Sequence, residues 1–217
     1  MQRWLNETWQ NYKSLLLFLV LMALFRSAIA DWNDVPTGSM NPTIIEGDRI
    51  LVNKLAYDLR IPFTHVSLFK RGDPLSGDII IFDSEVSDLR LVKRVIGVPG
   101  DVVSMNNNVL SINGQQLSYQ SLGGDQIAST VDAVEQLSGQ QYTVRTRPGS
   151  RVSSFAPLTV PQDYYFVLGD NRDNSADSRY IGFVPRDEVI GRSRSVVLSL
   201  DYENYFRPRA DRFFKTL

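Results

Sequence analysis

The sequence of 217 residues contains no cysteine and only one histidine, His65. The lack of cysteine excludes thiol catalysis, cysteine-ligated zinc and disulfide bonds, and a single histidine excludes a multi-histidine metal site within one chain. The formal net charge is −1, so no global positive field favours nucleic acid as a partner. Any chemistry must therefore come from Ser, Thr, Lys, Arg, Asp, Glu or Tyr.

Long hydrophobic runs are also scarce, and the longest one comprises the eleven residues 15–25. This run is shorter than the ~20 apolar residues typical of a membrane span. Arg26 and Trp32 follow it, and both residue types suit a membrane interface. We expect a single transmembrane anchor over residues 14–30, preceded by a short cytoplasmic N-terminus of residues 1–13.

A cleavable signal peptide is the alternative interpretation of the same segment. A basic start and an apolar run lead to Ala28-Ile29-Ala30, which has the small-x-small pattern of a cleavage site. Arg3 and Lys13 precede the run and acidic residues follow it, which favours an inside N-terminus and a body on the outer face.

Beyond residue 31 the chain has no long 3.6-residue periodicity, and short runs rich in Ile, Val, Leu and Tyr predict strands. These strands are expected at residues 49–52, 78–82, 89–97, 164–168 and 189–200. Residues 109–112 lead into Asn113-Gly114, a pair that predicts a type I′ hairpin turn. Residues 115–160 are polar, with weaker strand signals near 141–145, and predict an insertion or small second lobe. The aromatic and basic tail, 201–217, is expected to lie against the body or the membrane surface.

The loop Pro36-Thr37-Gly38-Ser39-Met40-Asn41-Pro42-Thr43 is the most informative segment. Prolines stiffen it, and Gly38 permits a close backbone approach beside Ser39. Such a loop is typical of a nucleophile or an oxyanion-binding amide. Nine Cα steps separate Ser39 from residue 30, so the serine lies within about 30 Å of the apolar segment. If that segment lies in a bilayer, the chemistry takes place at the membrane surface.

Lys93 and Arg94 lie in the predicted strand 89–97, and a period of two places them on opposite faces. A buried lysine loses its proton more readily and then serves as a general base. From these residues alone, an edge-strand lysine that blocks aggregation is the more frequent case.

Residues 169–179 form a polar loop with three aspartates, two asparagines, two arginines and two serines. A calcium loop is a rival interpretation, but the segment lacks the downstream glutamate and its arginines would repel a dication. A loop held by internal Asp–Arg pairs that positions one or two side chains is favoured.

Together these segments resemble the bacterial type I signal peptidases, which are membrane-anchored Ser/Lys endopeptidases. Four blocks occur in the family's order: SMNPT at 39–43, GDRILVNK at 47–54, KRVIGVPGD at 93–101, and GDNRDNSADSR at 169–179 followed by GFVP at 182–185. The resemblance implies a mostly β fold, with antiparallel sheets in a partly closed barrel-like body and one N-terminal membrane helix. The peptidase domain would occupy residues 31–217, with an insertion at about 104–160.

The resemblance also implies the catalytic roles. Ser39 would be the nucleophile, Lys93 the general base, and Ser175 the residue that orients the lysine amine. The backbone N–H of Ser39 and the hydroxyl of Thr37 would form the oxyanion hole. Serine is commoner than threonine at position 37 in the family, and the extra methyl restricts χ1. No metal or other cofactor is expected.

Further residues receive structural or binding roles from the same resemblance. Asp177 and Arg179 would pair to hold the loop, and Arg94 would be structural. The walls of shallow pockets for small side chains at −1 and −3 would include Val35, Met40, Ile44 and Val92. His65 is interpreted as a loop residue without a catalytic role.

The implied reaction is removal of N-terminal signal peptides from exported preproteins, on the outer face of the bacterial cytoplasmic membrane. The expected partners are signal peptides, membrane lipid and a nearby secretion translocon, but not nucleic acid. Three rivals remain: a processing peptidase of a conjugation system, a relative of self-cleaving repressors, and a non-catalytic signal-peptide-binding relative. The pattern at 28–30 also makes the bond after Ala30 a candidate for self-cleavage.

Overall fold

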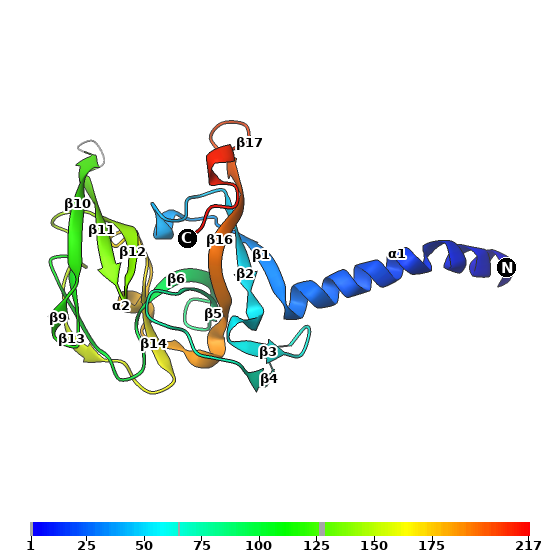
Figure 1. Cartoon of the computed structure of the whole chain (residues 1–217), viewed down its shortest axis with the longest axis horizontal. Helices are drawn as coiled ribbons and strands as arrows, with labels where there is room; N and C mark the ends of the chain where they lie inside the picture. The colour runs from blue at the N-terminus through cyan, green and yellow to red at the C-terminus, as the bar shows by residue number, and fades with distance from the viewer. Residues whose placement is uncertain (1, 65, 126–128) are drawn as a thin grey trace.

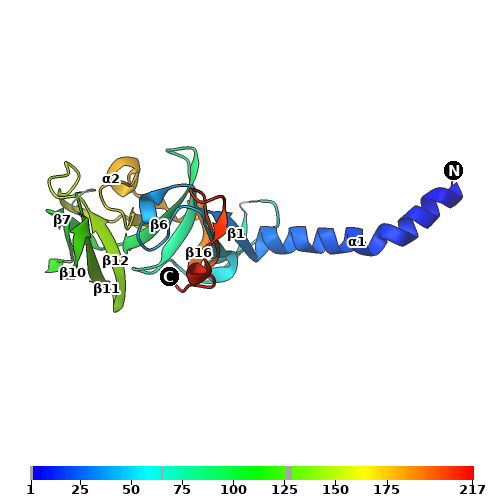
Figure 2. The ribbon, with the colours of Figure 1, turned by 90° about the horizontal axis from the view of Figure 1, so that it is seen from above.

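The computed structural model describes residues 2–64, 66–125 and 129–217. A long helix, α1 (Gln2–Ala28), extends away from a β-rich body (Figure 1). Figure 2 shows the same separation from a perpendicular direction. His65, which is predicted to lie in a loop, is outside the described residues.

Helix α1 begins twelve residues before the predicted segment 14–30. It ends two residues before the end of that segment, because β1 (Ala30–Asp34) starts there. Its last carbonyls are satisfied by the body: Lys54 Nζ donates to Arg26 O at 2.8 Å and to Ser27 O at 3.2 Å. In the part of the chain that the structure describes, no helix is long and apolar enough to cross a membrane.

The body is built on an eight-stranded antiparallel sheet with the order β1-β2-β16-β5-β6-β14-β15, in which β17 also pairs with β16. Its strands are β2 (Asp48–Asn53), β5 (Ile79–Ser84), β6 (Leu89–Gly97), β14 (Tyr164–Leu168), β15 (Val184–Pro185), β16 (Val189–Asp201) and β17 (Arg207–Pro208). The five strands predicted between residues 49 and 200 are all confirmed, with bounds that differ by at most two residues.

The predicted barrel-like closure is wrong for the described residues, since the sheet is open with β1 and β15 at its ends. Strand β15 has only two residues, and one of them is Pro185, which has no N–H to donate to a further strand. The mostly antiparallel β class is confirmed.

Residues 102–159 form a second lobe, at the far left in Figure 1. One of its sheets has the order β10-β11-β12 and the other has the order β13-β7-β8-β9. Their strands are β7 (Val102–Asn106), β8 (Val109–Ile112), β9 (Gln115–Gln116), β10 (Ser118–Asp125), β11 (Thr130–Leu137), β12 (Gln140–Thr146) and β13 (Phe155–Thr159). The predicted hairpin turn is confirmed, because Asn113 and Gly114 have φ of 52° and 80° between β8 and β9.

The remaining elements are short. They are β3 (Asp58–Arg60), which pairs with β4 (Ser67–Lys70), the helix α2 (Ser178–Ile181), and the 3₁₀ turns η1 (Gly38–Met40), η2 (Lys54–Ala56), η3 (Arg186–Glu188) and η4 (Ala210–Arg212).

Apolar cores cover both faces of the main sheet. Ile79 and Ile81 of β5 belong to one core, whereas the alternating Ile80 and Phe82 belong to the core on the opposite face. A third core joins β6 and β14 to the second lobe. The C-terminal tail lies against the body, where Leu217 packs on the first core and Arg212 pairs with the buried Asp48 at 2.5 Å. This is one of the two placements predicted for the tail.

Candidate active site

Ser39 lies in η1, within a tight loop that we call the nucleophile loop (residues 36–43). A Cβ at position 38 would lie 2.8 Å from Asn41 Nδ2, so glycine lets the Asn41 side chain pack closely against this turn. Thr37 precedes the turn in an extended conformation, and its exposed side chain makes no cap hydrogen bond. The predicted oxyanion donor Thr37 thus lies two residues before Ser39, with its side chain exposed.

Lys93 of β6 meets Ser39 from the sheet. Its Nζ lies 2.9 Å from Ser39 Oγ and also donates to Val92 O at 3.0 Å. The lysine is only 2% exposed. Burial lowers its pKa from 10.5 to about 8, although the carboxylates of Asp177 and Asp170 act in the opposite direction. A substantial fraction of Lys93 is therefore neutral in mildly alkaline solution, as a general base requires.

The topology of β6 explains how a loop reaches a lysine inside a sheet. Strand β14 pairs with β6 at Arg94, Val95 and Gly97 and then ends. The earlier part of β6 pairs only with β5 among the described strands. The nucleophile loop reaches Lys93 at this point, next to an open strand edge.

Residues 169–179, which we call the catalytic loop, hold the nucleophile loop in place. A Cβ at Gly169 would lie 2.4 Å from both Ser39 O and Ser175 Oγ, so the two loops meet too closely for any side chain at position 169. The Asn171 backbone N–H donates to Ser39 O, and its Nδ2 donates to Gly38 O, both at 3.0 Å. Asn171 is absent from the predicted site residues, although it lies in a block that carries the family resemblance.

Two arginine–aspartate pairs surround the lysine. Arg94 donates from Nε and Nη2 to Asp170 at 2.8 and 2.7 Å, and both side chains are buried. Asp177 accepts from Arg179 Nε and Nη2 at 2.8 Å, and from the Gly169 N–H at 3.1 Å. The structure thus brings Arg94, Asp177 and Arg179 together around the catalytic loop.

Ser175 lies in this loop but does not bond to the lysine. Its Oγ is buried next to Gly169, where it would lie 2.4 Å from an added Cβ, and it has no hydrogen-bond partner among the described residues. The lysine-orienting hydrogen bond implied by the resemblance is therefore not formed in this structure. In the part of the chain that the structure describes, no three His, Asp or Glu side chains are placed to hold a metal ion.

Sequence comparisons place this chain in a known family. The family described as "Signal peptidase, peptidase S26" matches residues 8–198. The chain belongs to this family. The resemblance inferred from the four blocks is confirmed, and as an S26 signal peptidase the chain is a serine peptidase.

Several curated relatives of this S26 peptidase are similar over most of its length. Signal peptidase I of Pseudomonas fluorescens is 34% identical over 202 residues, covering 86% of this chain and 71% of the relative. Signal peptidase I of Pseudomonas aeruginosa is 34% identical over 203 residues with the same coverage. Signal peptidase I P of Bacillus subtilis subsp. natto is 32% identical over 190 residues, covering 87% and 88%.

A crystal structure of a signal peptidase I from Enterococcus faecalis is 35% identical in sequence. It covers 56% of this chain and 97% of its own, with a TM-score of 0.38. The family assignment rests on the sequence matches and not on this superposition.

The four predicted pocket residues of the S26 peptidase lie in one core, beneath the nucleophile loop and β6. Val35, Met40 and Ile44 are fully buried in it, whereas Val92 is partly exposed at its margin. The structure therefore brings the four together, and Val92 has the most accessible surface of the set.

Proposed function

We propose that this S26 peptidase is a membrane-anchored endopeptidase that removes N-terminal signal peptides from exported preproteins, with Ser39 as nucleophile and Lys93 as general base. The observation that carries this proposal is the 2.9 Å contact between Lys93 Nζ and Ser39 Oγ at a buried site. Burial lowers the pKa of Lys93 to about 8, which makes the neutral amine accessible, and a neutral amine accepts the serine proton.

The proposed reaction proceeds through an acyl-enzyme. Ser39 Oγ attacks the scissile carbonyl while its proton passes to Lys93 Nζ, and the Ser39 N–H and Thr37 hydroxyl stabilise the oxyanion. Collapse breaks the peptide C–N bond, and Lys93 gives the proton to the leaving amine. Lys93 then activates a water molecule, which hydrolyses the ester and restores Ser39. Asn171, which donates hydrogen bonds to Ser39 O and Gly38 O, would keep the nucleophile loop rigid.

The open edge of β6 suggests how a peptide is presented to Ser39. Among the described strands, residues 89–93 of β6 pair with β5 on one side and with no strand on the other. An extended peptide that adds to this edge would form main-chain hydrogen bonds, while its alternate side chains would enter pockets. Small side chains at −1 and −3 would lie at the margin of the core, where Val92 is partly exposed next to the buried Val35 and Met40.

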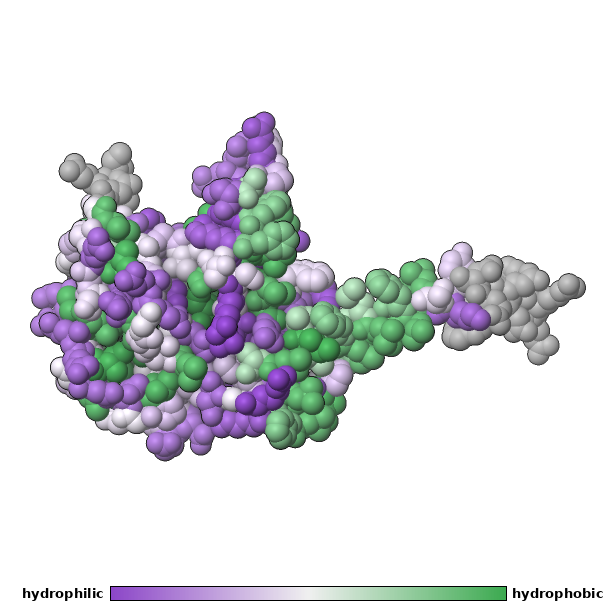
Figure 3. Space-filling model, in the orientation of Figure 1, coloured by the Kyte–Doolittle hydropathy of each residue, from purple (hydrophilic) through white to green (hydrophobic). Residues whose placement is uncertain are grey.

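We further propose that α1 attaches the domain to the bacterial cytoplasmic membrane, with the body on the outer face and near the secretion translocon. Apolar side chains of residues 15–25 are exposed along α1, as Figure 3 shows for the viewed face. At its end the guanidinium of Arg26 lies 4.3 Å from the centre of the Trp32 ring and pairs with Asp31 at 2.7 Å. These side chains suit a membrane interface. Strand β1 then leads to the nucleophile loop, so a membrane-embedded signal peptide would meet Ser39 close to the lipid.

Cleavage of a preprotein with an Ala-x-Ala site tests the proposal. The full chain in detergent or liposomes is compared with Ser39→Ala and Lys93→Ala, and the products are identified by intact mass. We expect cleavage after the site by the wild type only. Activity that survives either substitution would contradict the Ser/Lys mechanism.

The same experiment separates the rivals. Wild-type cleavage of a conjugation pilin precursor but not of general preproteins would favour a specialised processing peptidase. A wild type that binds the signal peptide and cuts neither substrate would be a binding relative. Intact masses of the wild type and Ser39→Ala also test self-cleavage, since a fragment starting at Asp31 in both proteins would exclude autolysis.

A further inference from the structure

Strand β12 of the second lobe lies beside both loops of the active site. Thr43 of the nucleophile loop donates from Oγ1 to Thr143 O at 3.3 Å. The Arg145 N–H donates to Asp170 O, and the Arg172 N–H donates to Arg145 O, both at 2.8 Å. The polar second lobe is thus joined to the loop that carries the nucleophile and to the loop that surrounds the base.

Tyr142 of β12 reaches the residue next to the base. The Cζ atom of Arg94 lies 3.6 Å from the centre of the Tyr142 ring, and both side chains are buried. The in-plane nitrogens of Arg94 are occupied, with Nε and Nη2 bonded to Asp170 and Nη1 to Gly77 O at 2.9 Å. Guanidinium N–H groups all point within the plane, so they do not restrain motion perpendicular to it. The stacked ring supplies that restraint through a desolvated cation–π contact.

The Tyr142 ring is also fixed by a hydrogen bond at its hydroxyl. The Tyr142 hydroxyl donates to Glu135, which also accepts from Tyr119 OH at 2.5 Å and from Arg172 Nη2 at 2.6 Å. Burial alone would raise the pKa of Glu135, but Arg172 and the two hydroxyls outweigh it and hold the pKa below its usual value. Glu135 therefore remains an anionic acceptor and fixes the orientation of Tyr142.

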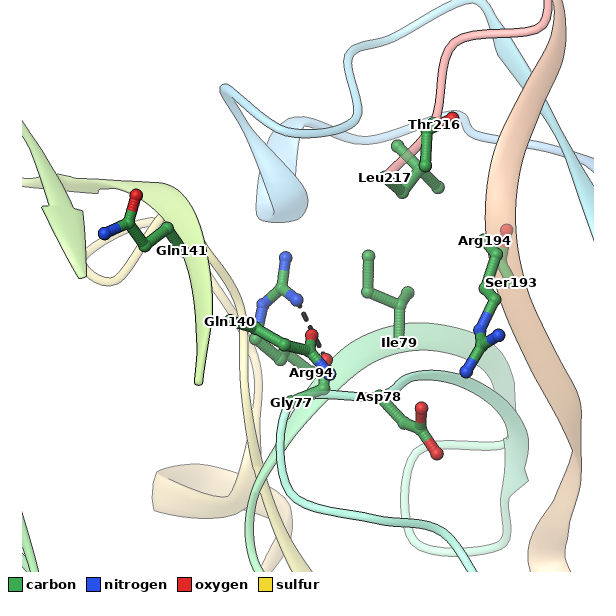
Figure 4. Close-up of a pocket in the computed structure, with 10 residues that line it drawn as sticks. All are labelled: Gly77, Asp78, Ile79, Arg94, Gln140, Gln141, Ser193, Arg194, Thr216 and Leu217. Atoms are coloured by element: carbon green, nitrogen blue, oxygen red, sulfur yellow. Dashed lines mark hydrogen bonds between the residues drawn. The ribbon is translucent and has the colours of Figure 1, made fainter. Parts of the chain in front are cut away.

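We propose that Tyr142 is a positioning residue, which holds the Arg94 guanidinium against Asp170 and so makes the second lobe part of the machinery that orients Lys93. Figure 4 shows Arg94 at the wall of a cavity of about 380 Å³, together with Gln140 and Gln141, which directly precede Tyr142 on β12. Shortening the Tyr142 side chain would extend this space over the face of the guanidinium and admit water to the Arg94–Asp170 pair.

The charges around Lys93 give this role a measurable consequence. The lysine is faced by Asp170 and Asp177, and both carboxylates favour its protonated form. Each carboxylate is offset by its arginine, Arg94 for Asp170 and Arg179 for Asp177. If Arg94 moves away from Asp170, the uncompensated carboxylate raises the pKa of Lys93. The acid limb of the rate profile then moves to higher pH.

The proposal rests on the function proposed above and is tested with the full chain and the Ala-x-Ala preprotein. The kcat and KM values are measured against pH for the wild type, Tyr142→Leu and Tyr142→Phe. We expect Tyr142→Leu to lower kcat by about tenfold or more, to move the acid limb upward, and to leave KM nearly unchanged. Tyr142→Phe keeps the stacked ring, so its acid limb should coincide with that of the wild type.

Tyr119→Leu and Tyr119→Phe are the matched controls, because Tyr119 also donates to the Glu135 carboxylate and packs against the same core. Among the described residues, the ring stacked on Arg94 is that of Tyr142 and not that of Tyr119. An acid limb of Tyr142→Leu that matches that of Tyr119→Leu would overturn the proposal, as would a shift in Tyr142→Phe as large as in Tyr142→Leu. If Tyr142→Leu does not fold, Tyr142→Met takes its place, since it fills more of the space but presents no ring to the Arg94 guanidinium. An unmoved limb there also overturns the proposal. An inactive wild type would instead refute the proposed function.

Discussion

Two lysines lie at two junctions of this protein, and their surroundings distinguish a lysine that holds a helix end from one that can exchange a proton. Lys54 lies where α1 meets the body, and its ammonium contacts Arg26 O, Ser27 O and, at 3.6 Å, a carboxylate oxygen of Asp31. Lys93 lies where the main sheet meets the catalytic loop, and its contacts are one hydroxyl and one carbonyl.

Burial lowers the pKa of both lysines, so burial alone does not identify a base. Carbonyl and carboxylate oxygens accept hydrogen bonds but never donate them, so the three acceptors around Lys54 match the three N–H donors of its ammonium form and none of them offers it a proton. The Ser39 hydroxyl can accept from the ammonium or donate to the neutral amine, so Lys93 keeps a partner in both protonation states. A lysine of the second kind can exchange a proton with its neighbour, whereas a lysine of the first kind ties a helix end in place.

The difference between the two lysines is tested most directly by removing each amine in turn. We expect Lys93→Met to lower kcat/KM for the preprotein by at least about a thousandfold, because the base is lost. Lys54→Met removes only a contact at the end of α1 and should leave activity within a few-fold of the wild type. A comparable loss in both variants would show that their different surroundings do not separate their roles.

A smaller but still large effect is expected from Gly169→Ala. The new Cβ would meet Ser39 O and Ser175 Oγ at 2.4 Å, so the catalytic loop must move away from Ser39. A misplacement of about 1 Å at a reacting group costs about 100-fold in rate, and we expect a loss of that order here. Gly72→Ala is the control, since its Cβ would meet only Ala56 O at 3.7 Å. Equal activity of the two variants would show that the close contact is not required.

The pH profile sharpens the assignment of Lys93. Its pKa of about 8 predicts an acid limb near pH 8, because the reactive form is the neutral amine. Below this value the rate should fall about tenfold for each pH unit, as the neutral fraction falls. The limb should persist in Lys54→Met. A profile that stays flat down to pH 5 would argue against Lys93 as the base.

The smallest effect is expected for the single histidine. His65→Ala should leave preprotein cleavage within a few-fold of the wild type, because the proposed mechanism gives its imidazole no role. Steady-state cleavage rates of Ser39→Ala, measured in parallel, show how large the loss of a catalytic residue is. A loss as large as that of Ser39→Ala would refute the Ser/Lys scheme.

Much of the fold could be predicted because strand signals are local. Strands β6 and β14 have the predicted bounds, and the Asn113-Gly114 turn has the predicted positive φ values. The closure of the sheet was predicted wrongly, since closure depends on whether the two edge strands meet. Tyr142, Glu135 and Arg172 were not singled out, because no local pattern distinguishes a tyrosine on a polar hairpin from one that covers a catalytic-site arginine.

The amino-acid sequence by itself determined the family, the antiparallel β class, and the residue types available for catalysis. These depend on short blocks, on a period of two and on the absence of cysteine, all of which are properties of neighbours along the chain. Only the tertiary structure decided how close the serine and this lysine lie and how deeply the lysine is buried. Ser39 and Lys93 are 54 positions apart. The desolvation that lowers the pKa of Lys93 exists only after β6, the nucleophile loop and the catalytic loop have packed around it.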